Sequence, residues 1–202
     1  ADAFTDYAGN NNSAASQFNW TYDSSSPSIT ISSSSVTSGT SSNDSTIILV
    51  FSTSEATSNF TVEDIKVQGG TLSNFSGSGN SYTVTLTPNS DGIVYIDIDR
   101  GVFTDESGNF STEATQFVWT YDGTGPTVTI SSSEVSNSSV SDDKSLSLTF
   151  TLNEASSNFT IDDISVTGGT ISNFSGSGTS YTATFTPSGN GQKQIKIESG
   201  KF

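Results

Sequence analysis

A gap-free internal repeat constrains this chain more than any other feature of its sequence. Shifting the 202-residue sequence by 99 residues brings Pro27 onto Pro126. The stretch from Gly69 to Gly79 then returns almost unchanged as the stretch from Gly168 to Gly178. Roughly half of all aligned positions are identical, which is the signature of a tandemly repeated structural unit.

The repeat also gives the expected domain boundaries. The segment from Trp20 to Asp23 aligns with the segment from Trp119 to Asp122, so the head of the chain repeats the end of a module. We predict that residues 1–23 are the last strand segment of a preceding or neighbouring module. We further predict that residues 24–122 are a complete module and that residues 123–202 are a module without its last strand.

Large apolar residues alternate with polar residues inside each repeat, and a period of two is typical of β-strands. In the clearest run, Leu146, Leu148 and Phe150 alternate with Ser147 and Thr149. Turn residues separate about seven such runs in each 99-residue repeat, as in a β-sandwich of about 100 residues. In the first copy these runs contain Ile29, Ile47, Ile65, Leu72, Tyr82, Val94 and Phe117.

Charge and composition narrow the range of partners. The chain has 6 Lys and Arg residues against 21 Asp and Glu residues, a formal net charge of −15. Nucleic acid and anionic membrane surfaces repel such a chain, so we expect neither as a partner. His, Cys and Met are absent, so any metal site must use oxygen ligands. No apolar run is long enough to span a membrane.

The same composition argues against catalysis. There is no His or Cys to act as a general base or a nucleophile. The cationic residues do not repeat, since Lys66 aligns with Ser165 and Lys144 aligns with Ser45. A carboxylate pair can hydrolyse a glycoside, but a pair repeated in each module is more simply structural. We expect no enzymatic activity.

Several short motifs follow one another in a fixed order. Phe-Thr-x-x-Asp-Ile-x-Val-x-Gly-Gly begins at Phe60 and at Phe159, and Asn-Phe-Ser-Gly-Ser-Gly follows from Asn74 and Asn173. Phe-Thr-Asp-x-x-Gly-Asn begins at Phe103. This order of motifs resembles the bacterial Ig-like repeats of large surface adhesins and extracellular fibres, and the resemblance covers the whole chain. It implies an all-β fold of tandem immunoglobulin-like sandwiches, extracellular display in many copies, and often calcium at domain junctions. It implies no particular ligand.

Four polar residues at one pole of the complete module, one of them in the linker that leads into it, are candidate calcium ligands. In an immunoglobulin-like topology, the entry linker and the loops after the second and sixth strands share one pole. Asp23 lies in that linker, Glu55 follows the second strand, and Asp105 and Asn109 follow the sixth. We expect them to converge at the junction with the preceding domain, where carboxylate and amide oxygens suit calcium. The equivalent candidates are Asp122 and Glu154 in the second copy and Asp6 and Asn10 at the head of the chain.

A simpler interpretation of these residues stays open. Asp-x-x-Gly-Asn is also a common turn sequence, and Asp122 suits a bend in a linker. Neither segment matches the EF-hand loop. Asp64 and Asp163 recur as well, in a motif where we expect one short helical turn. Capping of that turn explains these two residues as well as metal binding does.

The head of the chain carries Phe18, Trp20 and Tyr22 in the alternation of a core strand. If exposed, these rings could form a sugar-binding platform, but their alternation favours a buried strand that completes a sandwich. We expect residues 5–23 of one copy to fill residues 124–202 of a neighbouring copy or module. Two arrangements satisfy this expectation: a longer covalent array, or strand exchange between separate subunits of a pilus-like polymer.

The sequence therefore favours a structural module of an extracellular fibre or adhesin stalk, on or outside a bacterial cell. Identical modules would stack head to tail, with calcium at their junctions. The rival is a carbohydrate- or protein-binding adhesin module with a host or matrix ligand. A binding module should have one elaborated loop. The two copies align without a gap, which favours the stalk.

Overall fold

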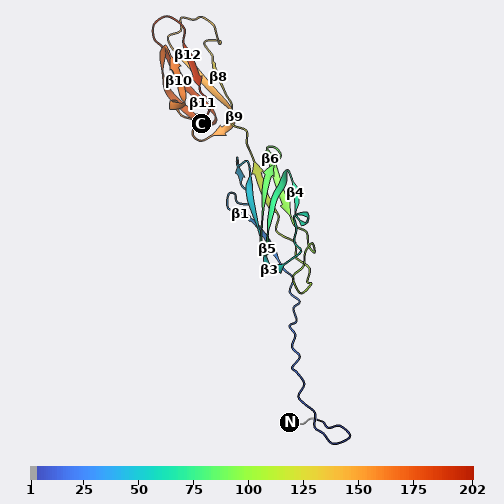
Figure 1. The fold of residues 1–202 in the computed structure, drawn as a ribbon. Coiled ribbons are helices and arrows are strands. Elements are labelled where there is room, and N and C mark those ends of the chain that lie inside the picture. Colours follow the sequence, from blue (N-terminus) through green and yellow to red (C-terminus); the bar gives the residue numbers. More distant parts are fainter. Residues whose placement is uncertain (1–3) are drawn as a thin grey trace. The chain divides into compact units, whose positions relative to one another are not determined.

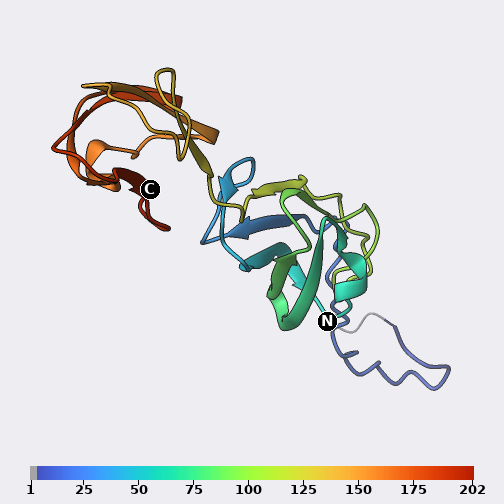
Figure 2. The same ribbon diagram turned by 90° about the horizontal axis from the view of Figure 1, so that it is seen from above.

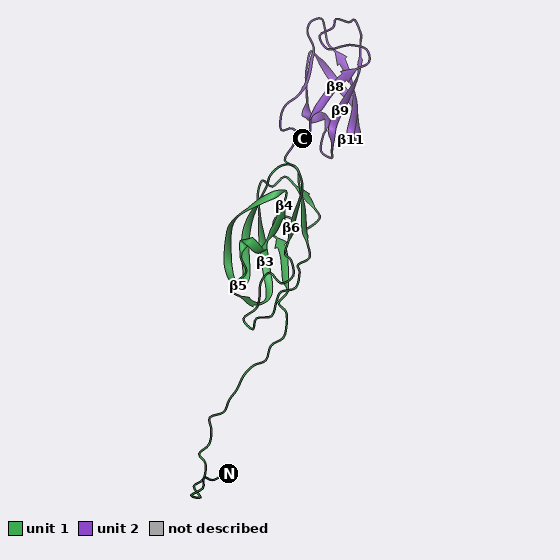
Figure 3. Cartoon of the chain, turned by 90° about the vertical axis from the view of Figure 1, so that its right-hand side faces the viewer, with its two compact units in different colours: residues 1–123 green, residues 124–202 purple. Residues whose placement is uncertain are grey.

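The chain forms two compact units, which are unit 1 (Ala1–Gly123) and unit 2 (Thr124–Phe202) (Figure 3). The structure is a computed structural model that describes residues 4–202; the first three residues of the predicted segment 1–23 lie outside the described part. The regular elements of residues 4–202 are β-strands and two single-turn 3-10 helices, so the all-β prediction is confirmed. No helix in this range is long and apolar enough to cross a membrane.

Unit 1 is a sandwich of two sheets. Its strands are β1 (Ile29–Ser33), β2 (Ser41–Ser42), β3 (Ile47–Thr57), β4 (Lys66–Gln68), β5 (Gly70–Pro88), β6 (Gly92–Asp97) and β7 (Phe117–Tyr121) (Figure 1). One sheet has the order β1-β3-β5 and the other has the order β2-β7-β6-β4. Strand β2 runs parallel to β7, and all other neighbours are antiparallel.

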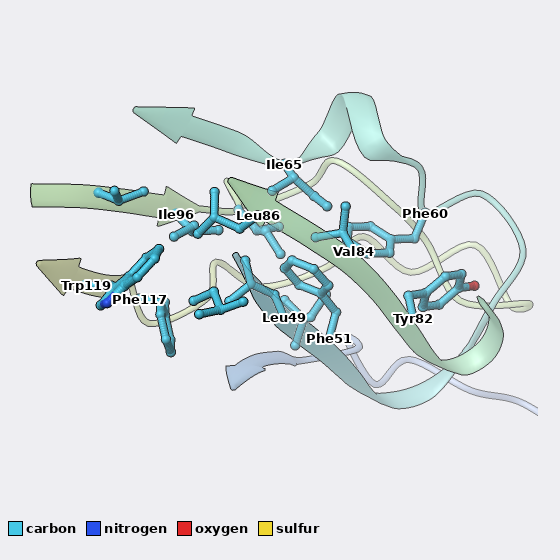
Figure 4. Packing of buried hydrophobic residues seen from close by; sticks show 14 of the residues in the cluster. Leu49, Phe51, Phe60, Ile65, Tyr82, Val84, Leu86, Ile96, Phe117 and Trp119 are labelled. Carbon is cyan, nitrogen blue, oxygen red and sulfur yellow. The ribbon is translucent and has the colours of Figure 1, made fainter. Parts of the chain in front are cut away.

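The alternating apolar residues of both sheets meet between the layers. Leu49 and Phe51 of β3 and Leu86 of β5 are fully buried. Trp119 of β7 is buried opposite them, as Figure 4 shows. Its indole N–H donates a hydrogen bond to Ser42 Oγ at 3.1 Å. Burial of large apolar side chains is the main stabilising contribution to such a core, and the indole keeps a polar partner within it.

Two features of unit 1 differ from the strand prediction. The separate strands expected near Leu72 and Tyr82 belong to one continuous strand, β5, which passes through the Gly-rich stretch. Gly77 has a φ of 136° there, and a Cβ at this position would lie 2.3 Å from the carbonyl oxygen of Ser81. Strand β2 was not predicted, because its two serines carry no hydrophobic alternation.

Unit 2 repeats most of this arrangement. Its strands are β8 (Val128–Ser132), β9 (Leu146–Ser156), β10 (Ile164–Thr167), β11 (Gly169–Pro187) and β12 (Gln194–Ile197). One sheet has the order β11-β9-β8, which matches β5-β3-β1 of unit 1. The other contains β10 and β12 and matches β4 and β6. Within the described residues, unit 2 has no counterpart of β2 or β7.

Each unit contains the expected single helical turn. These are η1 (Val62–Asp64) and η2 (Ile161–Asp163). The Asp64 carboxylate accepts a hydrogen bond from the backbone N–H of Thr61 at 2.8 Å, and Asp163 does the same for Thr160 at 2.7 Å. The two repeated aspartates therefore cap these turns, as one of the two interpretations predicted.

Residues 4–23 form no strand. An isolated bridge between Thr5 and Asn11 closes a loop, drawn in blue near the N-terminus in Figures 1 and 2. The three aromatic residues of this segment are largely exposed: Phe18 at 88 %, Trp20 at 71 % and Tyr22 at 74 %.

Candidate metal centre

Three carboxylates of unit 1 come together where the N-terminal segment enters the sandwich. One oxygen from each of Asp23, Glu55 and Asp105 lies within 4.8 Å of the other two. Asp23 precedes β1, and Asp105 lies in the loop between β6 and β7. Glu55 lies in β3 near its C-terminal end, whereas the sequence placed it in the following loop. The structure thus brings the three candidate carboxylates together, and the fourth candidate, Asn109, lies beside them.

The loop that carries Asp105 is built around its side chain. The carboxylate accepts hydrogen bonds from the backbone N–H and the side-chain amide of Asn109, both at 2.9 Å. Gly108 has a φ of 89°, and its N–H donates to the Asp105 carbonyl at 3.3 Å. The Asp-x-x-Gly-Asn sequence therefore does form a turn. The turn and the carboxylate cluster coexist, because the turn fixes where Asp105 lies.

Hydrogen bonding sets the charge state of Asp105. Partial burial acts to raise the pKa of this carboxyl, since it disfavours the ionised form. The hydrogen bonds from Asn109 and from the backbone of Ser107 and Gly108 outweigh it, so the pKa lies below the ordinary value of 3.8. Asp105 is therefore ionised at neutral pH.

Asp23 is held by the same loop. Its carboxylate accepts hydrogen bonds from the Ser25 N–H at 3.0 Å and from Ser107 Oγ at 3.1 Å. Its backbone carbonyl accepts a bond from the Asn109 amide at 3.4 Å. The amide nitrogen of Asn109 thus donates to both aspartates, which makes Asn109 a positioning residue of the cluster. Ser107 was missed in the sequence, because one serine in a Ser-rich chain carries no signal.

The pKa of Glu55 reflects repulsion between the carboxylates of the cluster. Its pKa is raised above 4.5, first by partial burial and then by repulsion from Asp23 and Asp105. In residues 4–202, none of the three carboxylates forms an ion pair with a lysine or arginine. The cluster is a concentration of negative charge without a cationic side chain, and a bound cation would relieve the repulsion.

The donor set fits a hard divalent cation. Calcium takes about six to eight oxygen ligands at about 2.3–2.6 Å, so oxygens that share one ion lie up to about 5 Å apart. The three carboxylates meet this spacing. Asp23, Glu55 and Asp105 would hold the ion, and Asn109 and Ser107 would keep the aspartates in place. Magnesium is a poorer match, because it demands a tighter octahedral geometry.

The other candidate residues lie apart from this cluster in sequence. Asp6 and Asn10 repeat the loop of Asp105 and Asn109: the Asp6 carboxylate accepts bonds from the Asn10 backbone and side chain, both at 2.9 Å. The Asn10 side chain is the main cause of a lowered pKa at Asp6. Asp122 directly follows β7. Glu154 lies in β9 and accepts a bond from its neighbour Asn153 at 2.9 Å.

Comparison with known proteins places the chain in a family. The sequence profile of the bacterial Ig-like domain matches residues 23–120 and matches again over residues 122–202. A search of curated proteins found no similar sequence. Domains of this family are usually extracellular or surface-associated structural modules. Because the two matches cover most of the sequence and coincide with the two copies of the repeat, the chain belongs to the bacterial Ig-like domain family.

Proposed function

We propose that this chain is a non-catalytic structural module of an extracellular fibre or adhesin stalk, stiffened by calcium. The observation that carries the proposal is the approach of Asp23 to Glu55 and Asp105. Asp23 belongs to the segment that leads into the sandwich, whereas the other two residues belong to the sandwich itself. A cation shared by the three would fix the direction in which the segment enters.

The repeat supports a mechanical role. Both copies have the same strands in their first sheet, with matching registers such as Ile31–Phe51 and Ile130–Phe150. The copies align without an insertion, so neither copy has a loop that is enlarged relative to the other, as a specialised binding module would. Uniform modules that follow one another along a chain give length rather than a specialised site.

The charge of the chain agrees with a cation requirement. At a formal charge of −15, negative side chains repel one another within each folded unit and between units. A divalent ion held by Asp23, Glu55 and Asp105 removes part of this repulsion where it is concentrated. Such an ion binds the folded state and not the unfolded chain, so it stabilises unit 1 by mass action.

Calorimetry of the whole chain tests the calcium proposal. We expect millimolar calcium to raise the melting temperature of unit 1 relative to chelator, and Glu55→Gln to abolish that increase. Glu106→Gln is a matched control, because it removes the same charge next to the cluster but outside it. A melting temperature that does not respond to calcium, or that responds equally in the two variants, would overturn the calcium site.

The exposed rings of the N-terminal segment support a second candidate, a carbohydrate-binding module. Phe18, Trp20 and Tyr22 are largely exposed in the described chain. However, the planes of Trp20 and Tyr22 meet at 75°, so the two rings form no flat platform for a sugar. A glycan array with the chain and its Trp20→Ser variant decides this: specific binding that the substitution removes would favour the carbohydrate role.

A further inference from the structure

Among residues 4–202, one edge of the β10-β12 sheet of unit 2 is open where unit 1 has strand β7. In unit 1, β6 lies between β4 and β7. In unit 2 the equivalent strand β12 pairs with β10, and within the described residues it has no neighbour on its other side. Unpaired backbone N–H and C=O groups along a strand edge favour addition of another strand.

The core of unit 2 is also less well covered. Several positions that are buried in unit 1 are only half-buried at the equivalent residues of unit 2. In unit 1 they are Ile29, Ile47, Ile96, Ile98 and Phe103, at 4 % exposure or less; in unit 2 they are Val128, Leu146, Ile195, Ile197 and Phe202. Incomplete burial of these apolar side chains leaves part of their hydrophobic stabilisation unrealised. A further strand in the place of β7 would cover these side chains and complete their burial.

A hollow in unit 2 marks where the added segment would lie. It is lined by Pro126, Val128, Ile197, Phe202 and the residues between the last two. In unit 1, residues 111–114 occupy the equivalent place. Their backbone bonds are Ser111 N–H to Phe103 O at 2.9 Å, Gly101 N–H to Ser111 O at 2.9 Å, Thr112 N–H to Pro27 O at 2.9 Å and Ala114 N–H to Ile98 O at 3.1 Å.

The N-terminal segment has the sequence and the local structure of the piece that fills this place in unit 1. Residues 4–23 align with residues 103–122, including Trp20 with the buried Trp119. Their loop already has the hydrogen bonds of its counterpart, since the Asp6 N–H donates to the Asn10 carbonyl at 3.0 Å and the Asp105 pair does so at 3.2 Å. The segment is thus shaped for a sandwich, while its aromatic rings remain exposed.

We propose that residues 4–22 of one copy of this chain bind the open edge of unit 2 in a second copy. This rests on the proposed structural role and names the partner that links the modules. The added strand runs antiparallel to β12, in the register that β7 has with β6. Tyr22 then lies opposite Gly191, Trp20 opposite Lys193, and Phe18 opposite Ile195.

The register has a second consequence in unit 2. In unit 1, β2 pairs with β7, and Trp119 donates to Ser42 within that contact. The equivalent stretch of unit 2, residues 137–141, is exposed and forms no strand. Trp20 of the incoming copy would donate to Ser141 Oγ, and this stretch would pair with the new strand as β2 pairs with β7.

Disulfide trapping tests the register, because the chain contains no cysteine of its own. Asn19 and Gln194 correspond to the opposed pair Val118 and Tyr95. Asn19→Cys and Gln194→Cys chains are mixed in a glutathione buffer, and linked peptides are quantified by mass spectrometry. The control partner is Ser131→Cys, which is exposed on β8 in the other sheet.

We expect the link between positions 19 and 194 to exceed the control link at least tenfold, in a species of twice the 21.0 kDa chain mass. Equal amounts of the two links would overturn the proposal. A chain that carries both substitutions tests whether the strand comes from the same chain. A link within one chain that persists at high dilution would show that its own N-terminal segment binds unit 2, and would overturn the proposed second copy.

Assembly is measured independently by light scattering of the unmodified chain. Phe18→Ser with Trp20→Ser should abolish assembly, whereas Ile48→Ser, at an exposed apolar residue of β3 outside the binding segment, should leave it intact. Assembly of all variants alike, or of none, would overturn the proposal. Calcium-dependent melting of unit 1 is unaffected by either result, so failure of strand addition is distinguishable from failure of the calcium proposal.

Discussion

The hydroxyl of Tyr82 donates a hydrogen bond to the backbone carbonyl of Thr57 at 2.7 Å. The register between β3 and β5 shifts between Ser52 and Thr57, so this bond joins the strands where their regular ladder is interrupted. Unit 2 repeats the contact, since Tyr181 donates to the Ser156 carbonyl at 2.7 Å. The tyrosine hydroxyl therefore links the two strands by a hydrogen bond inside an otherwise apolar layer. Burial raises the pKa of the Tyr82 hydroxyl.

Tyr82→Phe should destabilise unit 1 by about 1–3 kcal/mol, because the Thr57 carbonyl loses its donor while the ring keeps its packing. Calorimetric melting of the whole chain measures this loss at the unfolding transition of unit 1. Tyr7→Phe is the control, since Tyr7 is fully exposed. Equal stability of the Tyr82→Phe variant and the unmodified chain would contradict the role of the hydroxyl.

Two nearby glycines should differ sharply in their tolerance of alanine. Gly77 has a φ of 136°, and an added Cβ would lie 2.3 Å from Ser81 O and 2.5 Å from Tyr82 Cα. Gly79 has a φ of 64° and no atom within 4 Å of the added Cβ. We expect Gly79→Ala to cost about 1–2 kcal/mol, the penalty of a left-handed residue.

Gly77→Ala should cost clearly more than Gly79→Ala, because backbone must move as well. Calorimetric melting of the two variants side by side measures the difference. Equal losses would show that the chain at Gly77 relaxes without strain, contrary to the close approach seen here.

The all-β fold was predictable because side chains that alternate in burial also alternate in sequence. Leu148 and Phe150 are an example, since both are buried and Ser147, Thr149 and Thr151 flank them. Strand ends and pairings that rest on the backbone alone were not predictable. Strand β2 consists of Ser41 and Ser42 and exists because β7 lies beside it. No local signal reports such a neighbour.

The approach of Asp23, Glu55 and Asp105 was predictable from topology, since strand order decides which loops share a pole. Which atoms of each side chain face the cluster was not predictable. Asn109 was expected as a ligand, yet its amide nitrogen faces Asp105 and the Asp23 carbonyl. Sequence gives the residue type at a position, whereas the side-chain torsions that decide between ligand and support depend on packing.

Substitution of the two tryptophans should have very different effects on the stability of the unassembled chain. Trp119 is fully buried, so Trp119→Ala should destabilise unit 1 by about 3–5 kcal/mol. Trp20 occupies the equivalent position of the repeat but is 71 % exposed, so Trp20→Ala should leave the melting of unit 1 unchanged. Calorimetry at low protein concentration measures both. A large loss with Trp20→Ala would mean that its ring packs on unit 1.

Glu55 should destabilise unit 1 without calcium and stabilise it with calcium. Its folded-state pKa lies above 4.5, so the folded chain holds this proton more tightly than the unfolded chain. The stability of unit 1 therefore falls as pH rises from about 4.5 through the folded-state pKa. At neutral pH in chelator, Glu55→Gln should melt at a higher temperature than the unmodified chain, whereas saturating calcium should reverse the order.

Asp105→Asn provides the comparison of opposite sign within the same cluster. The pKa of Asp105 is lowered below 3.8, so its contribution to stability is present above 3.8 and is lost as pH falls through the folded-state value. This variant should therefore melt below the unmodified chain even in chelator. Calorimetric scans of both variants from acid to neutral pH, with and without calcium, separate the effects. A Glu55→Gln chain that is destabilised in chelator would show that Glu55 acts through a hydrogen bond rather than through repulsion by Asp23 and Asp105.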